Sequence, residues 1–167
     1  MYNGDIYVTL SHLNAGGQTD GFAVLLNRVG TRSGDPFGYA DNGFQIEFRD
    51  DALRGNVHTY RISLGGNPSA SLTGPLTGTW RPDGRTQDPS FVLDTDPVVT
   101  HLTSFANVNP GEGKWILFSA DLFGGKTAQL DSWGLTFGAV AVPESQSYSL
   151  ATGLLILLVA RKRFHKM

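Results

Sequence analysis

The sequence predicts an all-β chain: an antiparallel β-sandwich of jelly-roll type over residues 1–139, followed by a C-terminal hydrophobic helix. Three observations favour this fold class. The chain has 167 residues, enough for one domain with a hydrophobic core and too few for two. Aromatic and β-branched residues come in short runs broken by Gly, Pro, Asn and Asp. No stretch before residue 145 keeps a helical period over ten residues.

About eight short strands are expected in chain order. They cover residues 6–10, 22–27, 44–48, 58–64, 90–93, 101–105, 115–120 and 132–137. Residues 65–89 are expected to be mostly turns and loop, with 77–80 as the one candidate for a short strand. Two of them alternate clearly. Phe44 and Ile46 share a face with Phe48, and the pattern repeats over residues 60–64, so both are expected to be half-buried strands.

The strongest pair of expected strands is 115–120 and 132–137, joined by a turn with two glycines. The first is apolar on both faces, which is typical of a central strand. The predicted core residues of this pair are Trp115, Trp133, Leu135 and Phe137. Trp80 lies in a region rich in Gly and Pro, so we expect its loss to cost less than the loss of Trp115 or Trp133.

Charge and cysteine content exclude several kinds of function. Residues 1–142 hold nine basic and fourteen acidic side chains, and an acidic body of this kind is a poor nucleic-acid binder. The absence of cysteine excludes a disulfide framework, a thiolate nucleophile and a Cys-ligated zinc site.

The last 28 residues differ in character from the body. Residues 140–149 are a small, polar linker, residues 150–160 are free of charge, and residues 161–167 are basic. An apolar run of this length spans about 17 Å as a helix, less than the ~30 Å of a bilayer core. The predicted membrane and stop-transfer residues are Leu150, Leu154, Leu155, Ile156, Leu157, Leu158, Val159, Arg161, Lys162 and Arg163.

The order of motif, apolar run and basic end resembles a PEP-CTERM sorting tail. The motif residues are Val142, Pro143, Glu144 and Ser145, with serine where the family has its second proline. The resemblance implies an exosortase-type membrane enzyme as partner and export in a Gram-negative bacterium. It further implies transient residence in the inner membrane, and then the cell surface or an extracellular matrix, with exopolysaccharide as a further partner. A plain membrane anchor and an ordinary terminal helix are the alternatives.

The body resembles the P domain (Homo B domain) of proprotein convertases, through residues 4–12, 46–52, 78–84 and 102–137. The matching residues are Phe105, Trp115, Asp121, Ser132, Trp133 and Leu135. In that family the catalytic triad lies in a separate domain, so the resemblance implies an accessory module without catalysis. The family's first strand has no counterpart here, and residues 1–5 contain no export signal. We therefore expect a truncated N-terminus that leaves strand 6–10 without a neighbour and prone to associate.

Three kinds of site are weighed against structural roles. The four histidines (His12, His58, His101, His165) have no metal-binding spacing, which leaves a Ser-His-Asp set assembled from distant loops as the catalytic alternative. Asp50 and Asp51 are a candidate structural calcium site, although aspartate is also an ordinary turn residue. Tyr39 and Trp80, in Gly/Pro loops, are candidates for stacking on a sugar.

Together these patterns predict a non-catalytic, exported β-sandwich module that binds a ligand or serves as a spacer at the surface. The alternatives are a carbohydrate-binding jelly roll and an accessory P domain linked to a serine endopeptidase.

Overall fold

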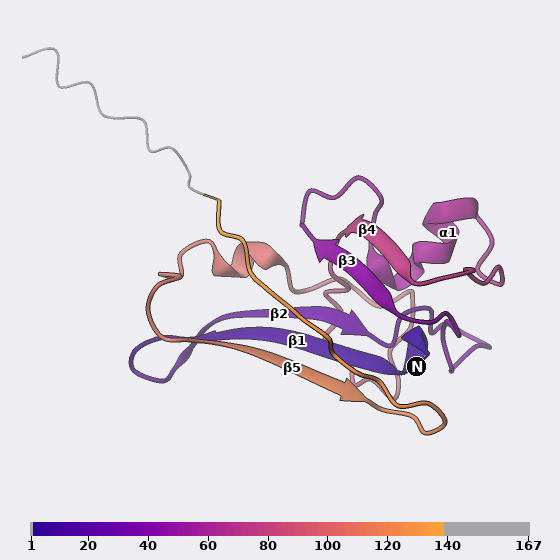
Figure 1. The fold of residues 1–167 in the computed structure, drawn as a ribbon, viewed down its shortest axis with the longest axis horizontal. Coiled ribbons are helices and arrows are strands. Elements are labelled where there is room, and N and C mark those ends of the chain that lie inside the picture. Colours follow the sequence, from indigo (N-terminus) through magenta and orange to yellow (C-terminus); the bar gives the residue numbers. More distant parts are fainter. Residues whose placement is uncertain (1, 139–167) are drawn as a thin grey trace, which may run out of the picture. The chain divides into compact units, whose positions relative to one another are not determined.

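Five β-strands form the framework of residues 2–138, the part of the chain that this computed structural model describes (Figure 1). The strands are β1 (Ile6–Leu13), β2 (Thr19–Asn27), β3 (Phe44–Phe48), β4 (Leu76–Trp80) and β5 (Lys114–Asp121). The helical elements are short: η1 (Asn3–Asp5), η2 (Val57–Thr59), α1 (Tyr60–Gly65) and η3 (Leu102–Phe105). The prediction of a mostly β chain with an antiparallel sheet is therefore confirmed.

The predicted linker, sorting motif, apolar helix and basic end, residues 140–167, lie outside the described residues. Within residues 2–138, no helix is long and apolar enough to cross a membrane. The chain divides after Trp133 into two units, and the described residues of the second, 134–138, form no helix or strand.

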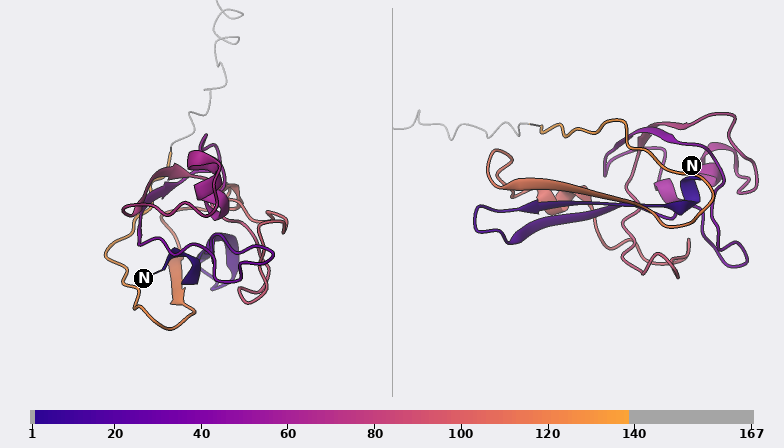
Figure 2. Two further views of the ribbon diagram at one scale, coloured as in Figure 1. Left: turned by 90° about the vertical axis from the view of Figure 1, so that its right-hand side faces the viewer. Right: turned by 60° about the horizontal axis from the view of Figure 1, so that its bottom comes forward.

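The strands form two sheets that lie in separate layers (Figures 1 and 2). One is a three-stranded antiparallel sheet in the order β2-β1-β5, and the other is the parallel pair β3-β4. β1 is thus a central strand with a neighbour on each side, and the prediction that residues 6–10 lack a neighbour is wrong. β5, predicted to be central, is instead an edge strand of its sheet.

The predicted alternation along β3 is confirmed. Phe44, Ile46 and Phe48 are half-buried and pack against the core, whereas Gln45 and Glu47 are exposed. In the stretch 65–89, expected to be mostly loop, the candidate strand at 77–80 does form, as β4.

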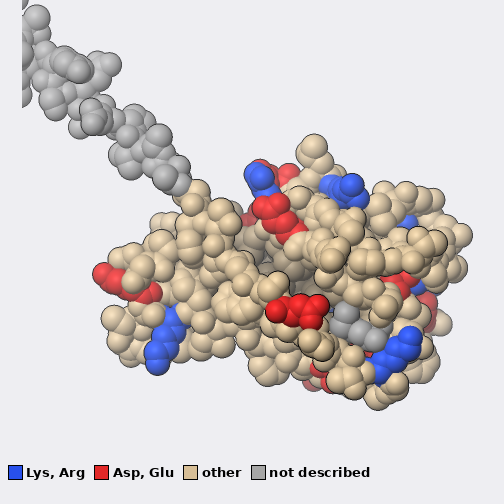
Figure 3. All heavy atoms as spheres, in the orientation of Figure 1, with Lys and Arg blue, Asp and Glu red and all other residues tan. Residues whose placement is uncertain are grey.

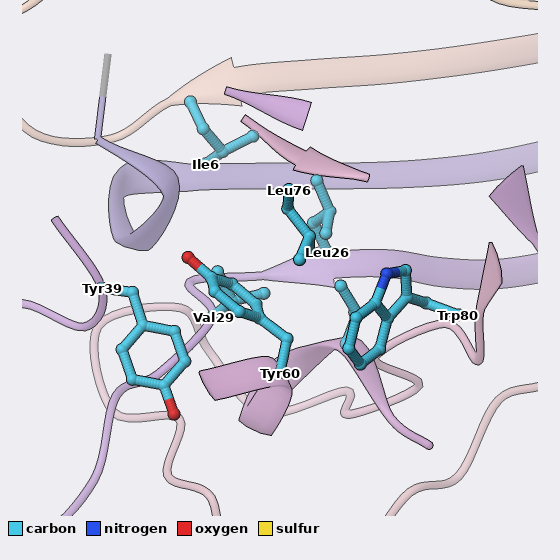
Figure 4. Packing of buried hydrophobic residues seen from close by; sticks show 8 residues of the cluster. Ile6, Leu26, Val29, Tyr39, Tyr60, Leu76 and Trp80 are labelled. Carbon is cyan, nitrogen blue, oxygen red and sulfur yellow. The ribbon is translucent and has the colours of Figure 1, made fainter. Parts of the chain in front are cut away.

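The main core lies between the two sheets and is built around three aromatic rings (Figure 4). Tyr60 lies between Tyr39 and Trp80, with ring centroids 4.7 Å from Tyr39 and 6.3 Å from Trp80. Both sheets and the loops between them contribute the aliphatic members of this cluster, which are Ile6, Leu26, Val29, Val57 and Leu76. Trp80 is fully buried, so the prediction that it matters less than the other tryptophans is not supported by its position.

A second, smaller cluster fills the other end of the three-stranded sheet. Leu10, Ala23 and Leu25 form its buried centre. Trp115 is half-buried against them, and its ring lies 5.1 Å from the ring of Phe105 in η3. Trp115 therefore contributes to a core, as predicted, but from an edge strand.

The strand predicted at 58–64 is helical instead. The Asn56 side chain accepts a hydrogen bond from the His58 amide and caps η2. Gly66, with φ of 73°, adopts the left-handed conformation that ends α1. These local signals outweigh the period-two pattern, and two residues expected in the core, Ile62 and Leu64, are exposed.

Three further predicted strands are absent from the described residues. Residues 90–93 form a turn and irregular backbone, residues 102–105 form η3, and residues 131–138 form no strand. The predicted core positions Trp133, Leu135 and Phe137 are 48%, 37% and 51% exposed. An alternating pattern specifies two faces, but it does not supply the neighbouring strand whose backbone must accept the hydrogen bonds.

Candidate functional site

Two histidines that the sequence left as loop or strand residues are buried and paired with aspartates. The Nδ1 atom of His58 lies 2.8 Å from Asp83 Oδ2, and its Nε2 atom lies 3.0 Å from the carbonyl oxygen of Thr31. His58 and Asp83 are both fully buried. Because both ring nitrogens are occupied, His58 has no nitrogen left to take a proton from a serine.

Asp83 is the centre of a buried polar cluster that fixes loop 81–94 on β2. Asp83 Oδ1 accepts a hydrogen bond from Arg85 at 3.1 Å. Asp83 Oδ2, the oxygen that faces His58, also accepts one from the backbone amide of Asn27 at 3.2 Å. Arg85 also donates to the Asp94 carbonyl at 2.8 Å. A charged group with this many partners stabilises a connection between loops, because removing any one partner leaves a buried charge unsatisfied.

Asp41 organises a second buried cluster beside the main core. It accepts two hydrogen bonds from Arg61, at 2.7 and 2.9 Å, one from the Tyr60 hydroxyl at 2.5 Å and one from the Leu72 amide at 2.7 Å. Burial alone would raise the pKa of Asp41, but these donors outweigh burial and lower the pKa below its usual value of 3.8. Burial and the adjacent carboxylate together raise the pKa of the Tyr60 hydroxyl.

Arg28 joins η1 and two loops at the end of β2. It is buried and has a left-handed backbone with φ of 48°, which non-glycine residues adopt rarely. Its guanidinium donates to the carbonyls of Gly4, Pro36 and Pro89 at 3.2, 2.7 and 3.0 Å. It also lies 4.1 Å from the ring centre of Phe123. Burial lowers the pKa of Arg28, and burial together with nearby Asp121 raises the pKa of Asp5.

The His12 clamp, formed by His12, Asp20 and the carbonyl of Glu112, closes the other end of the three-stranded sheet. The Nδ1 atom of His12 lies 2.6 Å from Asp20 Oδ1, and the Nε2 atom lies 2.7 Å from the Glu112 oxygen. The ring also packs 4.7 Å from Trp115. The hydrogen bond with Asp20, aided by the Glu112 carbonyl, raises the pKa of His12 above its usual 6.5 even though burial opposes this.

A pH-dependent stability follows from the His12 clamp. Because the folded pKa is raised, the clamp contributes fully below about pH 6.5, and its contribution is lost as pH rises through the folded pKa. We expect the melting temperature of the wild type to fall more than that of His12→Gln between about pH 6 and pH 9. Thermal melts across this range measure the difference. His101→Gln, at an exposed position, is the matched control, and an equal pH dependence in wild type and His12→Gln would exclude the clamp.

The candidate calcium residues, Asp50 and Asp51, both accept hydrogen bonds from protein donors, and the two carboxylates have different partners. Asp50 accepts from the Leu102 and Thr103 amides at 3.0 and 2.7 Å, which holds the start of η3. Asp51 forms a two-pronged pair with Arg49, with both distances at 2.9 Å. No group of three or more His, Asp or Glu side chains placed to hold a metal ion occurs within residues 2–138. Asp50 and Asp51 therefore fit the turn and capping roles that the sequence offered as the alternative.

The predicted sugar-stacking residues are not at the surface. Tyr39 and Trp80 are both buried in the main core, where Tyr39 contacts Tyr60 and the Trp80 Nε1 donates to the Thr77 carbonyl at 3.0 Å. Neither ring is exposed for stacking on a sugar, so both fit the alternative weighed in the sequence, a role in closing the core.

One shallow hollow is lined by residues 121–127, which are the last residue of β5 and the loop after it. Its charged groups are already engaged. Asp121 accepts the Ala128 amide at 2.9 Å, and the Lys126 ammonium lies 4.9 Å from the ring centre of Tyr2. The hollow lacks a histidine and a second carboxylate, so it does not form an acid–base pair.

Sequence reasoning missed the buried Asp41 and Asp83 clusters because their members are distant in the chain. Asp41 and Arg61 are 20 residues apart, and His58 and Asp83 are 25 apart. His12 and Asp20 are only eight apart, and their strands meet in a hairpin, so hairpin register is the signal that could have paired them.

Comparisons with known proteins add no relative: no family model, no curated protein and no solved structure matches the chain.

Proposed function

We propose that the chain is a non-catalytic, exported surface or extracellular module whose C-terminal residues are a sorting tail of the PEP-CTERM type. The observation that carries the proposal is the three-part order at the C-terminus: the motif 142–145, an uncharged apolar run 150–160 and the cations from Arg161. Each part has a separate physical role.

The basic residues of the tail set its orientation. Arg161, Lys162 and Arg163 resist translocation and stay on the cytoplasmic side, while the acidic body is exported. This orientation holds the motif 142–145 near the outer face of the inner membrane, within reach of an exosortase-type membrane enzyme. Because an apolar run of about 17 Å is short for a bilayer core of about 30 Å, it holds the chain during processing but is a poor permanent anchor.

For residues 1–139 we propose a passive role at the cell surface, as a binding or spacer module that lies among exopolysaccharide. Support comes from the buried charged residues. His58, Asp83, Asp41 and Arg28 each have several structural partners, so their roles in the fold account for them without a reaction. We further propose that the two sheets belong to a sandwich of P-domain or jelly-roll type, because they share one apolar cluster.

The test compares tail variants in a Gram-negative host that makes an exosortase-type enzyme. The variant Pro143→Ala/Glu144→Ala is expected to stay in the inner-membrane fraction, because the enzyme no longer recognises it. The control Gln146→Ala, just outside the motif, should leave the inner membrane as the wild type does. Equal release of the motif variant and the wild type would contradict the proposal.

A further inference from the structure

The chain contains two Asn-Gly steps, Asn3–Gly4 and Asn42–Gly43. Asparagine before glycine is especially prone to lose its amide, because glycine has no side chain to hinder attack by its own backbone nitrogen. The structure brings the two steps together, since the Asn3 backbone amide donates to the carbonyl of Asp41, next to Asn42, at 2.9 Å. One junction between η1 and residues 39–43 therefore contains both steps.

The Asn3 side chain holds both backbone groups of Gly43. Asn3 is fully buried. Its Oδ1 atom accepts a hydrogen bond from the Gly43 amide at 2.8 Å, and its Nδ2 atom donates to the Gly43 carbonyl at 3.2 Å. The amide of Leu76, at the start of β4, donates to the same carbonyl at 2.9 Å. The backbone of Gly43 is thus fixed from two sides.

Tyr60 determines which end of the Asn3 amide faces Gly43. The Tyr60 hydroxyl donates its one proton to Asp41 at 2.5 Å, so it can only accept from Asn3, whose Nδ2 atom lies 3.1 Å away. This leaves the Oδ1 atom of Asn3 to accept the Gly43 N–H. The proton held in that contact is the one that deamidation of Asn42 must remove.

Deamidation of Asn42 uses the backbone nitrogen of Gly43 as its nucleophile. That nitrogen loses its proton to a base in the solvent and attacks the Asn42 Cγ atom. The new C–N bond closes a succinimide ring, and the side-chain nitrogen takes up a proton and leaves as ammonia. Water then opens the ring at either carbonyl, which gives aspartate or isoaspartate. Asn42 is exposed, so base and water reach it, and the held Gly43 amide is the obstacle.

We propose that Asn42–Gly43 is a latent deamidation site that Asn3 keeps closed in the folded chain. While the Gly43 N–H is bound to Asn3, its nitrogen neither loses its proton readily nor turns toward the Asn42 side chain. The reaction requires η1 to separate from residues 39–43. Asn3–Gly4 is closed by the same junction, because the Gly4 amide donates to the Tyr39 carbonyl at 2.8 Å.

The modification prevents the junction from closing again. Isoaspartate adds a methylene to the main chain between Asp41 and Gly43, and either product adds a carboxylate beside Asp41. On the face that Figure 3 draws, acidic side chains lie beside basic ones at several places, where water screens them. Asp41 is instead buried with Arg61, so a second negative charge beside it is screened less. A transient opening of η1 thus becomes a lasting one.

The first test follows deamidation of the full chain in a mild detergent and a mildly alkaline buffer. Peptide mapping by mass spectrometry separates asparagine, aspartate and isoaspartate at position 42. The folded wild type is expected to react at least about tenfold more slowly than the same chain in urea, because only opened molecules react. Asn3→Ala, shown to be folded by circular dichroism, is expected to react several-fold faster than the wild type.

Leu10→Ala is the matched control for a general loss of stability. It removes a buried side chain from the second cluster and leaves the junction intact, so residue 42 should react at nearly the wild-type rate. Exchange of the Gly43 amide hydrogen in the wild type provides a test that needs no variant. Because exchange requires the same opening, its fold-protection should match the fold-slowing of deamidation.

Three results would overturn the proposal. One is a folded wild type that deamidates at Asn42 as fast as the chain in urea. The second is a folded Asn3→Ala that reacts no faster than the wild type, or a Leu10→Ala that is accelerated as much as Asn3→Ala. The third is a Gly43 amide that exchanges as fast as in the unfolded chain, which decides the matter even if Asn3→Ala does not fold.

Discussion

Trp80→Ala is expected to lower the unfolding free energy by about 3–5 kcal/mol, a third or more of the roughly 5–15 kcal/mol of a typical domain. Trp80 has no exposed surface, and it ends β4 against Tyr60 of α1. The Arg54 guanidinium lies 5.8 Å from its ring centre. Removing the indole leaves a cavity in the main core, where both sheets meet. Denaturant unfolding of the full chain followed by circular dichroism measures the loss.

Trp133→Ala is the matched control for this prediction. Trp133 is 48% exposed and lies in a segment that forms no strand, so its loss should cost clearly less than the loss of Trp80. This order is the reverse of the one that the sequence predicted. A greater loss of stability for Trp133→Ala than for Trp80→Ala would contradict the position of Trp80 in the main core.

Asp41→Asn is expected to cost about 3–5 kcal/mol, because it leaves the buried Arg61 guanidinium without its counter-charge. Asparagine keeps the volume and isolates the effect of the charge. Asp41 also holds Tyr60 and the Leu72 amide, so loop 66–72 and α1 should loosen together. Hydrogen exchange of the Leu72 amide reports this loosening directly, and denaturant unfolding gives the total loss.

Asp51→Asn is the control for Asp41, because Asp51 pairs with Arg49 at the exposed surface and its loss should change stability little. The lowered pKa of Asp41 adds a dependence on pH. Its contribution is complete above the usual value of 3.8 and disappears as pH falls through the lower folded pKa. Asp41→Asn should remove that acid dependence. Equal losses from Asp41→Asn and Asp51→Asn would contradict the buried cluster.

Sequence patterns predicted the strands whose signal is local. β1, β2, β3 and β5 each carry a run of β-branched or aromatic residues, and β3 alternates with period two as expected. The pattern failed at Tyr60, Ile62 and Leu64, where the Asn56 cap and the left-handed Gly66 specify a helix. Period two and a short helix are hard to distinguish over so few residues.

Burial and the candidate sites depended on contacts that the sequence does not show. Trp80 follows a stretch rich in Gly and Pro, and only its packing against Tyr60 of α1 shows that it belongs to the main core. Asp50 and Asp51, the candidate calcium ligands, bind the amides of η3 and the Arg49 guanidinium, partners that lie far from Asp50 in the sequence or are not specified by it. Long-range pairing of charged residues has no periodic signature, so neither Asp41 nor Asp83 could be assigned a partner in advance.

The intact mass of the native exported protein tests the central proposal most directly. If the tail is a sorting signal, the mature protein at the surface should lack all residues C-terminal to about Ser145, because the enzyme acts at the motif 142–145. Mass spectrometry of the surface fraction and of the inner-membrane fraction of the same cells gives both forms side by side. A mature surface protein that still carries residues 150–167 would contradict the sorting role and would show that the tail is a plain anchor.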